Sequence, residues 1–166
     1  MRSTSPSILV VESPGAPAEA VRAVTAALGA HASDVHSVSI NRDTFGAGTA
    51  ARMIQSFLGE EDGRRLEREL TAVAPSAVVA FTPGVAAVLI AARDRAGAAA
   101  APVVCVVPEL APRQDWPLDV DRYAVVDDEA AVALAEFGID GARVVVTGPV
   151  VAAGSSKRPR SSSFSR

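Results

Sequence analysis

The chain of 166 residues has little cysteine and few aromatic side chains. Its one cysteine, Cys105, has no partner for an intrachain disulfide, which argues for a reducing compartment such as the cytoplasm. Phe, Trp and Tyr together make up 4% of the residues, so aliphatic side chains must supply most of the core. A core rich in Ala and Val suits helices that pack closely on a sheet.

Long apolar segments are also missing. Residues 8–11 are apolar, but this run is too short for the apolar region of a signal peptide. No segment reaches the roughly 18 uncharged apolar residues that are needed to span a bilayer. We therefore expect a cytoplasmic protein, whose only contact with a membrane would be peripheral, at its inner face. The apolar side chains of residues 45–58 are the candidates for such a contact, although a helix facing the core explains them as well.

The net charge of -3 is too small to indicate a nucleic-acid binder, so no nucleic-acid partner is expected. The last twelve residues hold four basic side chains and no acid, so that the rest of the chain carries -7, which is -3 less +4. This composition predicts one domain over residues 1–151 and a disordered tail rich in Ser and Arg over residues 152–166.

Short apolar runs of strand length alternate with segments of helical period. The runs predict strands over residues 7–11, 35–40, 77–81, 103–107, 122–126 and 142–147. The helical periods predict helices over residues 17–28, 45–58, 66–73, 83–92 and 128–137. Gly29 is expected to end the first helix, and residues 60–63 are expected to form an acidic turn. Apolar strands separated by helices predict an α/β fold, a Rossmann-like three-layer sandwich with a parallel sheet of about six strands.

Ligands of such folds bind at the carboxyl ends of the strands, which selects the candidate loops. The first, Glu12-Ser13-Pro14-Gly15, stands where a phosphate cradle is expected but lacks a glycine-rich motif, so it is either a weak phosphate site or a plain turn. Thr82-Pro83-Gly84 opens a helix and is either an anion site or only a capped helix start. Gly148 lies in the last of these loops.

The loop over residues 108–116 contains Glu109, Arg113 and Trp116. Glu109 would serve as a general base if it were desolvated. The loop either binds a ligand, with Arg113 and Trp116 as contacts, or is solvated, with Trp116 covering an apolar edge. Asp127 and Asp128 are expected to cap a helix rather than to bind a metal.

Other kinds of site find little support. His31 and His36 lack the spacing and the neighbours of a metal motif, so no metal is expected. Cys105 is expected to be a small core residue, and the sequence has no G-x-S-x-G elbow of a hydrolase. No cofactor is expected.

A resemblance to a known family emerges from an ordered set of segments. They are residues 77–83, 102–109, 121–126 and 143–150, with Trp116 and Gly138-Ile139 between them. This set resembles the N-terminal, acceptor-side domain of the monogalactosyldiacylglycerol synthase family, whose relatives include the glycosyltransferase that makes lipid II. It covers residues 75–150 well and residues 7–30 loosely. The resemblance implies the GT-B arrangement of two Rossmann-like domains, in which a second domain binds the nucleotide sugar.

The chain departs from this family pattern in several places. The family has a glycine-rich first loop with a histidine, where this chain has Ser13-Pro14-Gly15-Ala16. A Thr-Asp pair and a later histidine of the family are replaced by Pro108-Glu109 and Arg113. Residues 41–65 look like a shortened form of the family's membrane-facing insertion. Too few residues follow Pro149 to form the nucleotide-sugar domain.

These features lead to three hypotheses. The first is an acceptor-side domain that is inactive alone and, once a companion chain supplies the donor domain, transfers a hexosyl group from a nucleotide sugar to a lipid hydroxyl. In that case Glu109 is the candidate base, and Thr82 to Gly84 contact the acceptor or a phosphate. The second is a non-catalytic α/β binding module. The third is a truncated glycosyltransferase fragment.

Overall fold

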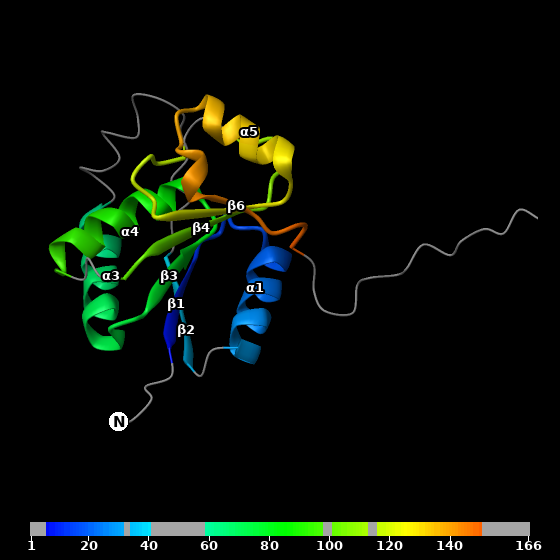
Figure 1. The fold of residues 1–166 in the computed structure, drawn as a ribbon. Coiled ribbons are helices and arrows are strands. Elements are labelled where there is room, and N and C mark those ends of the chain that lie inside the picture. The colour runs from blue at the N-terminus through cyan, green and yellow to red at the C-terminus, as the bar shows by residue number, and fades with distance from the viewer. Residues whose placement is uncertain (1–5, 32–33, 41–58, 98–100, 113–115, 151–166) are drawn as a thin grey trace, which may run out of the picture.

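A computed structural model describes residues 6–31, 34–40, 59–97, 101–112 and 116–150 of the chain (Figure 1). The predicted helix over 45–58, the predicted tail over 152–166 and Arg113 lie outside the described residues.

One sheet of six parallel strands forms the centre of the fold, with the strand order β2-β1-β3-β4-β5-β6. The strands are β1 (Ser7–Glu12), β2 (Asp34–Ser39), β3 (Ala77–Ala80), β4 (Val103–Val107), β5 (Arg122–Val125) and β6 (Val144–Val146). Every strand predicted from the sequence is present. The predicted α/β fold with a parallel sheet is therefore confirmed.

Helices cover both faces of the sheet. They are α1 (Ala18–His31), α3 (Gly59–Val73), α4 (Pro83–Arg95) and α5 (Asp128–Glu136), with a short 3₁₀ turn, η1 (Gly141–Arg143). Figure 1 shows α1 on one face, with α3 and α4 on the opposite face. Within the described ranges, no helix is long and apolar enough to span a membrane.

Successive strand residues point to opposite faces and so build two separate cores. On the side of α3, α4 and α5, Val78, Cys105 and Tyr123 are fully buried together with Leu89 of α4 and Leu134 of α5. The core on the α1 side is smaller. Its buried members are Val10, Ala20, Val21, Val79, Phe81 and Val106.

Three boundaries differ from the sequence-based expectation. Gly29 lies inside α1, because a single glycine costs a helix only about 1 kcal/mol. Residues 60–63 belong to α3 rather than to a turn. A Cβ atom on Gly63 would lie 2.7 Å from Arg95 Nη2, so a larger residue there would displace the end of the Arg95 side chain. The last strand is shorter than predicted because Asp140 accepts a hydrogen bond from Ala142 N (3.0 Å) and begins η1 instead.

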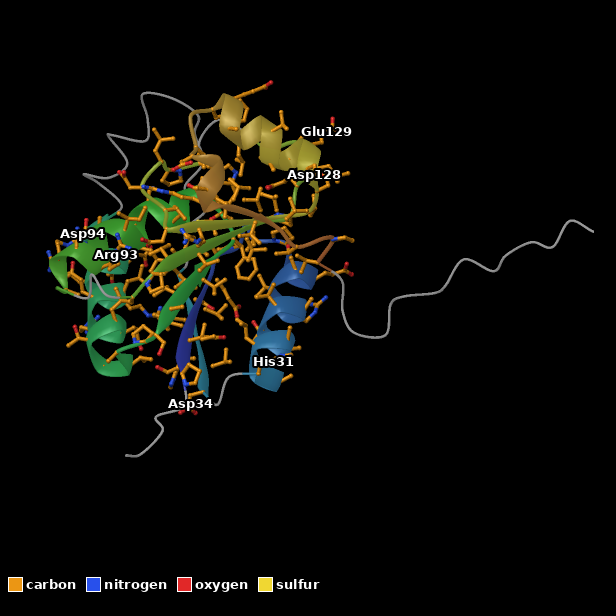
Figure 2. The ribbon with its side chains drawn as sticks, in the orientation of Figure 1. His31, Asp34, Arg93, Asp94, Asp128 and Glu129 are labelled. Carbon is orange, nitrogen blue, oxygen red and sulfur yellow. The ribbon has the colours of Figure 1, made fainter. Side chains whose placement is uncertain are left out.

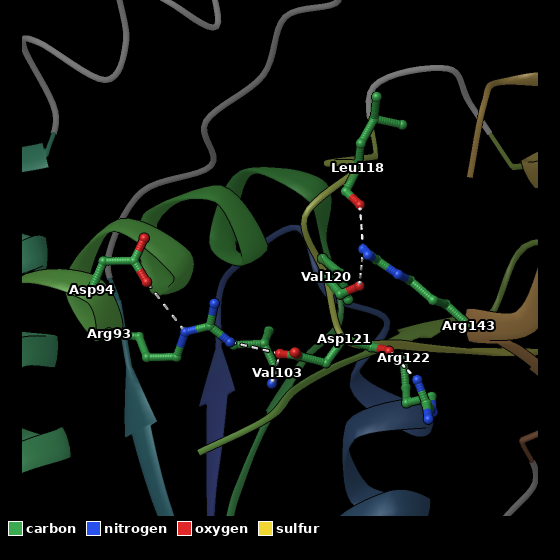
Figure 3. A network of polar contacts seen from close by, with 8 residues as sticks. All are labelled: Arg93, Asp94, Val103, Leu118, Val120, Asp121, Arg122 and Arg143. Carbon is green, nitrogen blue, oxygen red and sulfur yellow. Dashed lines mark hydrogen bonds and ion pairs between the residues drawn. The ribbon is translucent and has the colours of Figure 1, made fainter. Parts of the chain in front are cut away.

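A polar network fixes the amino ends of β4 and β5 (Figure 3). Asp121 Oδ2 accepts hydrogen bonds from Val103 N at 2.8 Å and from Arg93 Nη1 at 2.6 Å. Arg143 Nη1 donates to Leu118 O at 2.9 Å. These contacts lie at the end of the sheet opposite to the expected ligand edge, so they are structural.

Candidate functional site

The strand order reverses direction at β1. The chain passes from β1 through α1 to β2 on one side and then returns to β3 on the other side of β1. The loops that leave the carboxyl ends of β1 and β3 therefore diverge, and ligands of open parallel sheets bind at this kind of position. The candidate site is built from the loops at this edge.

The loop after β1 is a tight turn, in which Ala16 N donates to Ser13 O at 2.9 Å. Ser13 is half-buried, whereas Pro14 and Gly15 are exposed. This turn and one flank of α1 enclose a pocket of about 590 Å³, here called the α1 pocket. Its described lining residues are Glu12, Ser13, Pro14, Ala16, Ala18, Val21, Arg22, Thr25 and Ala26.

Two polar residues of the α1 pocket are absent from the sequence-based candidates, namely Arg22 and Thr25. They lie three residues apart on α1, whereas Glu12, which belongs to the predicted loop, ends β1. The signal that would find them is the helical spacing of Ala18, Arg22 and Thr25 directly after a predicted ligand loop. Sequence reasoning examined the loop and not the helix flank beside it.

Thr82, Pro83 and Gly84 form the start of α4, as predicted. Thr82 has extended backbone angles, and its hydroxyl accepts a hydrogen bond from Val85 N at 3.4 Å. Pro83 is the first residue of the helix. The capped start is confirmed, and all three residues are only half-buried, so the positive end of the helix dipole at α4 is accessible.

Glu109 and Trp116, both in the loop after β4, differ in their burial. Glu109 is exposed at the carboxyl edge, so it lacks the desolvation that a general base would require. Trp116 is buried and packs edge-on against Tyr123, with ring centroids 6.1 Å apart. The alternative in which Trp116 covers apolar surface therefore describes its position.

At the carboxyl end of β5, Asp127 caps α5, since its Oδ1 accepts from Ala130 N at 2.8 Å. Asp128 and Glu129 follow at the exposed start of α5 (Figure 2). At the carboxyl end of β6, Thr147 Oγ1 donates to Val125 O at 3.2 Å. Gly148 has a φ of +81°, a backbone conformation that favours glycine, so its position serves the turn.

The residues predicted not to bind metal are placed apart. His31 and Asp34 lie at the opposite end of the sheet from Asp128 and Glu129 (Figure 2), and both histidines are exposed. Among the described residues, no group of three or more His, Cys, Asp or Glu side chains lies close enough to hold a metal ion. Cys105 is a core residue, and its burial raises the pKa of the thiol far above the ordinary value.

A second hollow of about 990 Å³ runs along α3. Its described lining residues are Glu61, Arg64, Glu67, Arg68, Thr71, Ala72 and Ala96. Glu67 forms an ion pair with Arg95 at its rim. No described residue of the carboxyl-edge loops lines this hollow, so it does not extend the candidate site.

Comparison with solved structures finds a similar fold in part of several longer chains. The chain is similar to MnaA of S. aureus, solved with UDP, at a TM-score of 0.60 and 15% identity, over 87% of this chain and 44% of that one. It is similar to the lipopolysaccharide outer core galactosyltransferase WaaB at a TM-score of 0.58 and 13% identity, over 84% and 44%. It is also similar to a putative UDP-N-acetylglucosamine 2-epimerase from Listeria monocytogenes at 0.58 and 14%, over 88% and 45%.

The chain spans less than half the length of these solved structures. No protein-family model matches the sequence, and neither does any curated protein. At these identities the likeness shows the fold alone, and it does not single out the monogalactosyldiacylglycerol synthase family.

Proposed function

We propose that this domain is the acceptor-side half of a sugar transferase of the monogalactosyldiacylglycerol synthase type. In the complete enzyme, a second domain, here called the second lobe, holds a nucleotide sugar. A hexosyl group is then transferred from this sugar to a hydroxyl group of a lipid acceptor. The second lobe is supplied by a companion chain. The domain by itself is inactive in this proposal.

One observation carries the proposal. The fold matches nucleotide-sugar enzymes over 84% to 88% of this chain, yet its first carboxyl-edge loop has a single glycine between two prolines. Such a loop offers few backbone N–H groups to a diphosphate, so it is poorly suited to hold a nucleotide. The α1 pocket and the open start of α4 instead leave room for an acceptor at the same edge.

Two carboxylates at this edge are candidates for the base that takes the proton from the acceptor hydroxyl. Glu109 is the one predicted from the sequence, and Glu12 is the one that lines the α1 pocket. Because Glu109 is exposed, the closing second lobe would have to desolvate it. Thr82 to Gly84 would contact the acceptor at the start of α4.

Purification of the tagged chain from its native host, under mild conditions, tests the proposal. We expect the complex to transfer labelled hexose from a nucleotide sugar to neutral lipid, and we expect a salt wash that removes the companion chain to abolish transfer. Transfer by the washed chain alone would contradict the proposal. A complex without any transfer would favour the non-catalytic binding module.

A matched set of variants locates the chemistry. Glu12→Gln or Glu109→Gln should reduce transfer by about 10²-fold or more, depending on which carboxylate is the base. Glu136→Gln removes an exposed carboxylate at the last residue of α5 and should leave transfer unchanged. Equal activity of all three variants would remove both carboxylates from the mechanism.

A further inference from the structure

The α1 pocket has the dimensions of a small-molecule site. Its volume of about 590 Å³ falls within the range of pockets that hold small ligands. One wall is the turn after β1, and the other is a stripe of α1 in which Ala18, Arg22 and Thr25 lie on one flank. Pro14, Val21 and Ala26 supply apolar surface.

The charged groups of the α1 pocket balance each other. Glu12 contributes one carboxylate and Arg22 one guanidinium, and neither forms an ion pair within the described part of the chain. A phosphate would meet the carboxylate as well as the guanidinium, so an anion gains little here. A ligand hydroxyl can accept from the guanidinium and donate to the carboxylate, so a neutral polyhydroxylated ligand suits this pair.

Thr25 differs from the other described helical threonine. In α3, Thr71 Oγ1 donates to Glu67 O at 2.8 Å, which is the usual bond of a threonine inside a helix. Thr25 Oγ1 in α1 is buried and has no hydrogen-bond partner. Thr25 also lines the α1 pocket, so this unpaired hydroxyl is a candidate partner for a ligand that binds there.

We infer that the α1 pocket binds a neutral polyhydroxylated group, such as a hexose or glycerol unit, through Glu12, Arg22 and Thr25. The inference rests on the proposed function, because it names the head group of the acceptor that this half would hold. It gives Arg22 the role of a donor to the ligand and Thr25 that of a partner for one further hydroxyl. Glu12 accepts from the hydroxyl closest to the edge of the sheet.

An NMR titration of the full chain tests the inference without the companion chain. The probes are methyl hexosides, glycerol, a hexose 1-phosphate and inorganic phosphate. We expect methyl hexosides to shift the amide signals of residues 12–26 with a dissociation constant of about 1 mM, and inorganic phosphate to shift them at least about threefold more weakly. Stronger binding of phosphate, or no shift of residues 12–26, would overturn the inference.

Two variants and a control sharpen the titration. Thr25→Val keeps the shape of the side chain and should weaken the hexoside about fivefold, the effect of one lost hydrogen bond. Arg22→Gln should weaken it at least as much. Thr71→Val, the same change on α3, should leave the affinity unchanged. Equal affinities for Thr25→Val and Thr71→Val would contradict the role of Thr25.

The two proposals fail separately. If hexosides bind in the α1 pocket but the purified complex transfers no sugar, the proposed function is wrong and the binding site stands. If the complex transfers sugar and the Arg22 and Thr25 variants transfer it as well as the parent chain does, the assignment of the α1 pocket is wrong.

Discussion

The two faces of the sheet are covered unequally. Among the described residues, twenty-four buried side chains cluster on the face of α3, α4 and α5, against six on the face of α1. The larger cluster includes the ring of Tyr123 and has members on β1 to β5, with Val144 of β6 packed against it. The α1 side carries the α1 pocket beside its small core. The face of α3, α4 and α5 therefore contributes most of the stability of the fold, and the face of α1 leaves a pocket available for a ligand.

The largest contrast between the faces should appear in thiol labelling. Cys105 lies in the larger cluster with no exposure, and burial raises the pKa of its thiol, so the reactive thiolate forms only on unfolding. We expect Cys105 in the native chain to react with iodoacetamide at least about 10³-fold more slowly than in the unfolded chain. Ala30→Cys, on the exposed face of α1, should react at nearly the unfolded rate. Rates within tenfold of each other would show that the larger face opens as readily as α1.

Truncation of one leucine on each face is the next test. Leu89→Ala removes a fully buried side chain of α4 and should lower the free energy of unfolding by about 3 kcal/mol. Leu28→Ala removes a partly buried side chain of α1 and should cost about 1 kcal/mol. Urea unfolding of both variants measures the difference. An equal loss would mean that the two cores contribute alike.

The polar network around Asp121 also contributes to the stability of the face covered by α3, α4 and α5. Asp121→Ala leaves the amide of Val103 and the guanidinium of Arg93 without their acceptor, and the Arg93 side chain is only 13% exposed. We expect a loss of about 2 kcal/mol, because groups that are left unpaired while buried are costly. Asp34→Ala, at the exposed start of β2, is the matched control and should change stability by less than about 0.5 kcal/mol.

Alkaline pH should lower the free energy of unfolding through two groups of the larger cluster, Cys105 and Tyr123. Burial raises the pKa of both Cys105 and Tyr123, so above pH 9 the unfolded chain releases a thiol proton that the folded chain retains. The unfolded state then binds fewer protons, and stability falls as the pH rises, by up to about 1.4 kcal/mol per pH unit from Cys105. Tyr123 adds to the slope above pH 10. Cys105→Ala should flatten the fall between pH 9 and 10, and an unchanged slope would contradict this origin.

Many strands and helix caps on the face covered by α3, α4 and α5 were predictable from the sequence. Apolar runs such as 77–81 and 103–107 are buried strands because they are apolar at every position, and Thr82 and Asp127 are caps because their side chains accept from nearby amides. The glycine at position 63 predicts a turn but lies inside α3, where the end of the Arg95 side chain approaches it in a tertiary contact. Local patterns carry no information about such contacts.

The candidate site was predicted less well, for a related reason. The rule that ligands meet carboxyl ends of strands selected the loop at Ser13, which lines the α1 pocket. It did not select Arg22 or Thr25, because a polar residue on a helix flank resembles any solvated side chain until its neighbours are known. It also gave Trp116 a share in binding, although the ring is buried against Tyr123.

The central claim is that this domain serves the acceptor and leaves the nucleotide sugar to a second lobe. Isothermal titration of a UDP-hexose into the isolated chain tests it most directly. We predict no heat beyond that of dilution up to millimolar nucleotide sugar. Saturable binding with a dissociation constant tighter than about 100 μM would place the donor site in this domain and contradict the account.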